Sequence, residues 1–174
     1  MTPLDAEIQD LVSRLADILS RKRLFLAVAE SCTGGMLGEV LTQQAGASTF
    51  FKGGIIAYTN DSKAKLLAVP QRILAAHGAV SRPTVEWMAR SACRVFESEC
   101  AMSISGIAGP EGGSAAKPVG TVCIGACVIN TSDSVRRVFA GDRATVRVRA
   151  VAAALRQLHK LLQSPAPTRP ACAS

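Results

Sequence analysis

The chain is poor in aromatic residues and in long apolar runs, and each shortage excludes a class of structure. Only 4% of its 174 residues are aromatic although 48% are hydrophobic, so Ala, Val, Ile and Leu must build the core. No apolar run approaches the roughly 20 residues that a membrane-spanning helix needs. The N-terminal residues also lack the basic and apolar segments of a signal peptide. We therefore expect a cytoplasmic protein of ordinary domain size that has no membrane partner.

Metal-binding patterns are missing as well. The six cysteines contain no C-x-x-C pair, and the two histidines, His77 and His159, lie far apart in the sequence. Cys123 and Cys127 are four positions apart on a predicted strand, where both would face one side as small core residues. We expect reduced thiols and no structural metal.

Acidic residues are scarce in one region only. Residues 136–170 hold eight basic residues against Asp142 alone, whereas the rest of the chain is balanced, so the net charge of +7 comes from this region. A localised basic surface could bind nucleic acid or a phosphorylated small molecule, or it could be a solvated helix face without a partner. The charge pattern leaves these alternatives open.

Hydrophobic periodicity predicts alternating helices and strands, with a β-hairpin late in the chain. Thr2 and Asp5 form a helix-start pattern at the N-terminus, and Asp142 can cap the last helix. The sequence thus predicts a mixed α/β sheet covered by helices on both faces. A proline-rich tail predicted to be disordered occupies 164–174 and leaves 1–163 as one domain. The predicted helices are 4–19, 35–44, 61–68, 71–77, 83–98 and the segment after 142; the strands are 24–29, 50–58, 101–105, 119–129 and 134–140, with 130–133 as the hairpin turn.

One predicted strand-to-helix turn carries hydroxyl groups and glycines. The segment 29–35 reads Ala-Glu-Ser-Cys-Thr-Gly-Gly and follows a short apolar run. A hydroxyl at such a turn has exposed backbone N–H groups and the positive end of a helix dipole beside it, which suits attack on a carbonyl. The alternative interpretation is that Ser31 or Thr33 only caps the helix.

A serine nucleophile needs a base, and lysine is the best candidate. Neither histidine is well placed, and no G-x-S-x-G motif is present. If Asn60 caps the helix that follows, Lys63 falls in its first turn, where the helix dipole opposes a cation. Burial there would lower the pKa of Lys63 toward the neutral, basic form. The alternative is that Lys63 reaches into water.

Two further features could bind a ligand. The glycine-rich segment 105–113 offers backbone amides, but it has neither the Walker ending nor the G-x-G-x-x-G spacing, so it could equally be a turn. Arg143 follows Asp142 at the start of the basic helix and suits a carboxylate or phosphate. It could also be an ordinary surface arginine beside a cap.

Six blocks of sequence occur in a recognisable order: Ala29–Gly35, Gly54–Asn60, Lys63, His77–Ser81, Ser105–Pro110 and Lys117–Val122. Together they resemble the CinA C-terminal domain family, the nicotinamide mononucleotide deamidases. The resemblance covers about residues 5–162 and implies a three-layer α/β/α sandwich around a mixed, mostly parallel sheet of about five strands. It also implies a homo-oligomer and chemistry without metal or organic cofactor.

The resemblance implies an amidohydrolase that converts nicotinamide mononucleotide to nicotinic acid mononucleotide and ammonia. Ser31 would be the nucleophile, Lys63 its base, and Tyr58 would orient the pair. The oxyanion would be held by backbone N–H groups, and the ribose phosphate by side chains and a glycine near the loop. The residues implied are Thr33, Gly34 and Gly35 for the oxyanion and Ser105, Gly106 and Arg143 for the ribose phosphate.

A second hypothesis is a catalytically silent module of the same fold that binds a nucleotide, a nucleic acid or a protein. The basic region 136–170 motivates it, and it predicts salt-sensitive nucleic-acid binding without ammonia release. Because every implied catalytic position is intact, we favour the enzyme and expect no nucleic-acid partner.

Overall fold

The computed structural model describes residues 2–164 of the chain. The predicted proline-rich tail, apart from Ser164, lies outside the described residues. Within them, every helix is too short or too polar to span a lipid bilayer. The elements are α1 (Pro3–Lys22), β1 (Leu26–Glu30), α2 (Met36–Thr42), the 3₁₀ helix η1 (Ala47–Thr49), β2 (Phe51–Ile56), α3 (Asn60–Leu67), α4 (Gln71–His77), α5 (Arg82–Phe96), β3 (Cys100–Gly106), β4 (Thr121–Val128), β5 (Thr131–Val138) and α6 (Arg143–Gln163).

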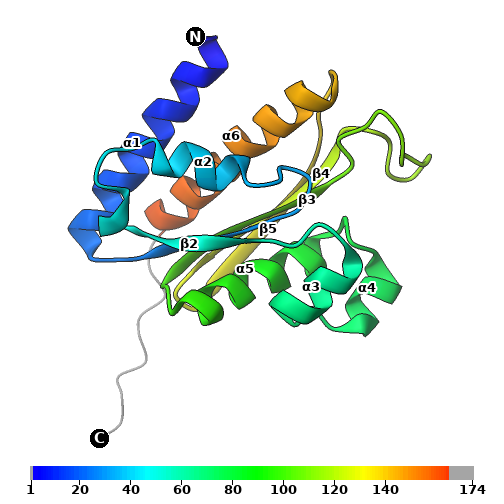
Figure 1. Ribbon diagram of the computed structural model, residues 1–174, viewed down its shortest axis with the longest axis horizontal. Coiled ribbons are helices and arrows are strands. Elements are labelled where there is room, and N and C mark those ends of the chain that lie inside the picture. Colours follow the sequence, from blue (N-terminus) through cyan, green and yellow to red (C-terminus); the bar gives the residue numbers. More distant parts are fainter. Residues whose placement is uncertain (1, 165–174) are drawn as a thin grey trace, which may run out of the picture.

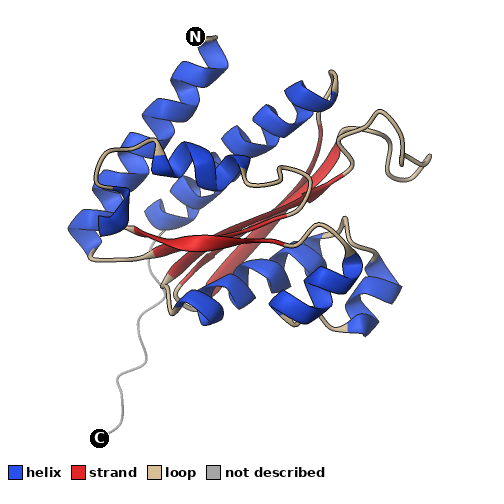
Figure 2. Cartoon of the chain, in the orientation of Figure 1, coloured by secondary structure: helices blue, strands red, loops and turns tan. Residues whose placement is uncertain are grey.

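A five-stranded mixed sheet forms the middle layer, in the order β2-β1-β3-β4-β5. β1 pairs in parallel with β2 and β3, while β4 is antiparallel to both β3 and β5, so only β4 opposes the common direction. Helices α1, α2 and α6 cover one face, and α3, α4 and α5 cover the other (Figures 1 and 2). This arrangement confirms the predicted three-layer α/β/α sandwich.

Successive side chains of the central strands point to opposite faces of the sheet, so the core is divided into two clusters. In β1, Leu26 and Val28 pack in the cluster beneath α1 and α6, whereas Ala27 and Ala29 belong to the cluster beneath α5. The smaller side chains let α5 approach the sheet closely. At Gly125 a Cβ atom would lie 2.7 Å from the carbonyl oxygen of Val85 on α5, so this position accepts no side chain without a shift.

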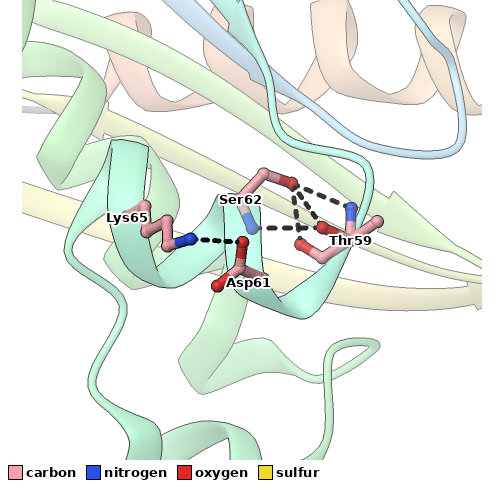
Figure 3. A network of polar contacts seen from close by, with 4 residues as sticks. All are labelled: Thr59, Asp61, Ser62 and Lys65. Atoms are coloured by element: carbon pink, nitrogen blue, oxygen red, sulfur yellow. Dashed lines mark hydrogen bonds and ion pairs between the residues drawn. The ribbon is translucent and has the colours of Figure 1, made fainter.

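Local sequence rules explain most helix starts, with one correction. Thr2 and Asp5 form the predicted capping box of α1, and the Asp142 side chain accepts the Thr145 amide of α6 as predicted. The cap of α3 is Thr59, whereas Asn60 was predicted. Thr59 and Ser62 exchange side-chain and backbone hydrogen bonds, at 3.1 and 2.9 Å (Figure 3).

The hairpin turn is also tighter than predicted. Instead of residues 130–133, it consists of Ile129 and Asn130, and Ile129 has a left-handed φ of 54°. Polar residues that are typical of turns are here part of β5, because their side chains find partners on the sheet. The carboxylate of Asp133, for example, accepts hydrogen bonds from the Ser134 amide and from Nε2 of Gln157.

Candidate active site

The carboxyl ends of β1, β2 and β3 bring the predicted nucleophile and base together. Ser31 directly follows β1, and Lys63 lies on α3, which follows β2. The chain passes from β1 to β2 on one side and returns to β3 on the other, so the site lies where α/β sheets commonly bind ligands. Nζ of Lys63 is 2.9 Å from Oγ of Ser31, and these residues are only 1% and 6% exposed.

The surroundings of the Lys63 amine favour its neutral form. Burial lowers its pKa from the ordinary value of 10.5. Nζ also lies 3.0 Å from the carbonyl oxygen of Ala57 and 3.2 Å from that of Tyr58. In this arrangement Nζ also donates to Oγ of Ser31, and Oγ donates to the carbonyl oxygen of Tyr58 at 3.4 Å. A neutral amine has only two N–H groups, so when both are given to the carbonyl oxygens its lone pair can accept the proton of Ser31, as a general base requires.

The carboxylate of Glu30 binds the free amides at the N-terminus of α2, a contact that the sequence analysis missed. Its carboxylate is 1% exposed and accepts the amides of Gly35, Leu37 and Gly38 at 2.8–3.1 Å. Neither Ser31 nor Thr33 caps this helix, because Gly35 is its N-cap and makes no side-chain cap. The positive helix end is therefore already neutralised by a carboxylate.

This arrangement changes which amides can hold an oxyanion. The Gly35 amide is bound to Glu30, and the Gly34 amide donates to the carbonyl oxygen of Ser31 at 3.0 Å. Two of the three predicted donors are therefore engaged. Among residues 2–164, the amides of Cys32 and Thr33 find no hydrogen-bond acceptor. Within the turn, these two N–H groups are therefore the ones left to donate to an oxyanion.

Tyr58 contributes its backbone to the pair and its side chain to Arg143. The phenol is on a residue that is 56% exposed, and Nη2 of Arg143 donates to its Oη at 2.9 Å. Nη1 of Arg143 donates to the carbonyl oxygen of Gly109 at 3.0 Å. Arg143 thus links the loop before α3 to the glycine-rich loop, although it lies 85 positions from Tyr58.

Ser105 and Gly106 end β3 beside Ser31. The Ser31 amide donates to the carbonyl oxygen of Ile104 at 3.0 Å, which continues the β1–β3 register and sets Ser31 beside Ser105. Ser105 is buried. A Cβ on Gly106 would lie 3.1 Å from Sγ of Cys32 and 2.8 Å from Val122, so the nucleophile turn packs against bare backbone there.

A second arginine of α6, also missed, contacts the turn. Nη2 of Arg147 donates to the carbonyl oxygen of Thr33 at 2.6 Å. Its spacing of four from Arg143 places both arginines on one side of α6, and that spacing is the signal that could have identified it.

Cys32, which follows Ser31, lies in the core beneath α1, α2 and α6. Burial raises the pKa of its thiol to about 11, so the thiol is protonated at neutral pH. The other described cysteines are free as well, and within residues 2–164 no three His, Cys, Asp or Glu side chains gather as a metal site.

The chain matches known proteins over nearly all of its described residues. The family model of the CinA C-terminal domain matches residues 8–162. "Nicotinamide-nucleotide amidohydrolase PncC" of Escherichia coli K12 is 43% identical over 155 residues, which cover 88% of this chain and 94% of that protein. A "CinA-like protein" of Gemmatimonas aurantiaca is 44% identical over 151 residues, but the chain covers only 35% of its length.

Solved structures show the same fold. The crystal structure of competence/damage inducible protein CihA from Agrobacterium tumefaciens has a TM-score of 0.87 and 37% identity, covering 90% of this chain and 96% of that one. A CinA superfamily protein from Escherichia coli has a TM-score of 0.87 and 35% identity, covering 92% and 93%.

Proposed function

We propose that this chain, which belongs to the CinA C-terminal domain family, hydrolyses the carboxamide of nicotinamide mononucleotide to nicotinic acid mononucleotide and ammonia. The observation that carries the proposal is the buried contact of 2.9 Å between Ser31 and Lys63. It occurs in a chain that matches nearly the full length of a protein named as a nicotinamide-nucleotide amidohydrolase.

In the first half of the reaction, Oγ of Ser31 attacks the carboxamide carbon while its proton passes to Nζ of Lys63. The carbonyl oxygen gains a negative charge, and the amides of Cys32 and Thr33, which find no acceptor within residues 2–164, would donate to it. When the C–N bond breaks, Lys63 gives its proton to the departing nitrogen. Ammonia leaves and an ester on Ser31 remains.

In the second half, water attacks the ester carbon and Lys63, neutral again, accepts a proton of that water. The bond between the carbon and Oγ of Ser31 breaks, Oγ takes the proton back from Lys63, and the carboxylic acid is released. The carbonyl oxygens of Ala57 and Tyr58 hold Nζ in place during both steps. Tyr58 therefore orients the pair through its backbone, which is the role we propose for it.

For the ribose phosphate we propose Arg143, with Ser105 and Gly106 lining the neighbouring strand end. Arg143 contacts only neutral oxygens, and among residues 2–164 no carboxylate lies within ion-pair distance of it. A phosphate would replace these contacts with charge-assisted hydrogen bonds, which are roughly twice as strong.

Ammonia release tests the proposal directly. Wild-type protein is incubated without added metal with nicotinamide mononucleotide or free nicotinamide, and the Ser31→Ala and Lys63→Ala variants are run beside it. We expect release from the mononucleotide only, and a loss of about 10⁴-fold or more in both variants. Circular dichroism verifies that the variants fold. Turnover retained in Ser31→Ala, or no release by the wild type, contradicts the proposal.

A further inference from the structure

We propose that Arg147 is a positioning residue that holds the nucleophile turn, Ser31–Gly35, in its reactive conformation. The inference rests on the proposed function, because it assigns the turn a role in stabilising an oxyanion. Its starting point is the hydrogen bond of 2.6 Å from Nη2 of Arg147 to the carbonyl oxygen of Thr33, which joins residues 114 positions apart.

The turn needs such support because its second half is conformationally soft. Gly34 and Gly35 both have positive φ values, 60° and 100°. Consecutive glycines allow the peptide planes between them and before them to rotate at little cost. The carbonyl oxygen of Thr33 has one other partner, the Met36 amide, at a longer 3.3 Å. The charge-assisted bond from Arg147 is therefore the stronger of the two restraints on this peptide.

The restraint acts on the two amides that remain for an oxyanion. The carbonyl that Arg147 binds lies in the peptide plane next to the one that carries the Thr33 N–H, and the two planes are joined at the Cα of Thr33. Holding the carbonyl therefore limits the φ and ψ angles that Thr33 can adopt, and with them the direction of its N–H. The Cys32 amide lies one peptide earlier in the same turn. Glu30 fixes the far end of the turn through the Gly35 amide, and Arg147 fixes its middle.

A purely structural role leaves the charge of Arg147 unexplained. Its side chain is half-buried, its Nε finds no partner in residues 2–164, and no described carboxylate lies within ion-pair distance. Arg156, farther along the same helix, is paired with Glu7. The guanidinium of Arg147 instead faces the turn, where it donates to the carbonyl oxygen of Thr33.

Arg149 offers a matched control on the same helix. Its Nη1 donates to the carbonyl oxygen of Ala140, also at 2.6 Å, but away from the nucleophile turn. We therefore compare Arg147→Met, Arg147→Lys and Arg149→Met with the wild type. Lysine preserves the charge and one donor, and the contact at Thr33 uses a single N–H.

The main readout is the rate at which a fluorophosphonate probe modifies Ser31, followed by intact mass. In that reaction Oγ bonds to phosphorus, fluoride leaves, and the proton passes to Lys63. Because the probe is not a nucleotide, it reports on the nucleophile whatever the natural substrate is. We expect labelling to slow by about tenfold to 100-fold in Arg147→Met. Arg147→Lys should remain within about threefold of the wild type, and Arg149→Met within about twofold.

Steady-state kinetics on nicotinamide mononucleotide give the second readout. We expect kcat to fall in Arg147→Met while KM changes less than about threefold, since positioning acts on the reacting atoms. Labelling of Arg147→Met within twofold of the wild type overturns the inference, and so does an equal loss in Arg149→Met. If Arg147→Met does not fold, Arg147→Gln replaces it under the same criteria.

The two proposals fail separately. A wild type that is labelled at Ser31 but releases no ammonia from the mononucleotide refutes the substrate, and the variants still test Arg147. A wild type that is not labelled overturns the role of Ser31 and this inference together.

Discussion

The pH dependence of the reaction follows from the burial of Lys63. An ordinary lysine with a pKa near 10.5 is neutral in only about one molecule in a thousand at pH 7.5. Every tenfold rise in that fraction requires burial to lower the pKa by about one more pH unit. If neutral Lys63 is the base, log(kcat/KM) should rise with a slope of one below its pKa and reach a plateau below pH 10.5. Ammonia release measured between pH 6 and pH 10 gives this profile.

The lowered pKa of Lys63 also predicts a pH-dependent contribution to stability. Because this pKa is lower in the folded state, the unfolded chain binds more protons between the two pKa values, so stability rises with pH across that window. The contribution is fully present above the unfolded value and is lost as the pH falls through the folded value. A pKa lowered by one pH unit corresponds to about 1.4 kcal/mol, or roughly 3–6 °C in Tm for a chain of this size.

Two lysine variants separate this effect from general titration. Lys63→Met should lose the part of the stability gain between pH 7 and pH 9.5 that is due to Lys63. Lys65→Met should keep it, because Lys65 is exposed and pairs with Asp61 on the surface of α3 (Figure 3). Urea denaturation at both pH values measures the difference. An identical pH dependence in wild type and Lys63→Met would refute the reasoning, as would a rate profile without an inflection below pH 10.5.

Three further predictions concern the surroundings of the pair. Cys32→Ala should keep ammonia release within about twofold of the wild type, because the thiol is buried and protonated, and a larger loss would implicate it in the chemistry. Glu30→Gln should lower the free energy of unfolding by about 2 kcal/mol or more, since its buried carboxylate accepts hydrogen bonds from three amides. The exposed Glu39→Gln should change it by less than about 0.5 kcal/mol in urea titrations. Arg143→Met should raise KM for nicotinamide mononucleotide by about tenfold to 100-fold; an unchanged KM would place the phosphate elsewhere.

Local rules predicted what depends on neighbours in the sequence. The caps of α1 and α6 were predicted correctly because Thr2 and Asp142 bond to residues three positions away. The helix and strand order followed from hydrophobic spacing. The hairpin turn was wrong because Asp133 finds its side-chain partner on α6, 24 positions away, and thereby stays within β5.

Contacts between distant segments were beyond such rules. Lys63 was identified because it breaks a local preference, but only the fold shows that it lies at Ser31, 32 positions earlier. Glu30 was overlooked although it adjoins Ser31, the predicted nucleophile, since no sequence pattern marks a carboxylate at the end of a buried strand as a helix cap. Arg147 gave no signal beyond its spacing from Arg143, because its contact depends on how α6 packs over the turn.

The distribution of charge around Ser31 fits a site that is built for a transient anion. The carboxylate of Glu30, beside the turn, accepts hydrogen bonds from the amides at the N-terminus of α2. Those amides are therefore not available to a ligand. Positive charge instead comes from Arg143 and Arg147 on α6, neither of which has a described carboxylate partner. Burial favours the neutral form of the third basic group, Lys63. Under the proposed function, Arg143 would bind the ribose phosphate, and Arg147 would hold the turn whose amides donate to the oxyanion.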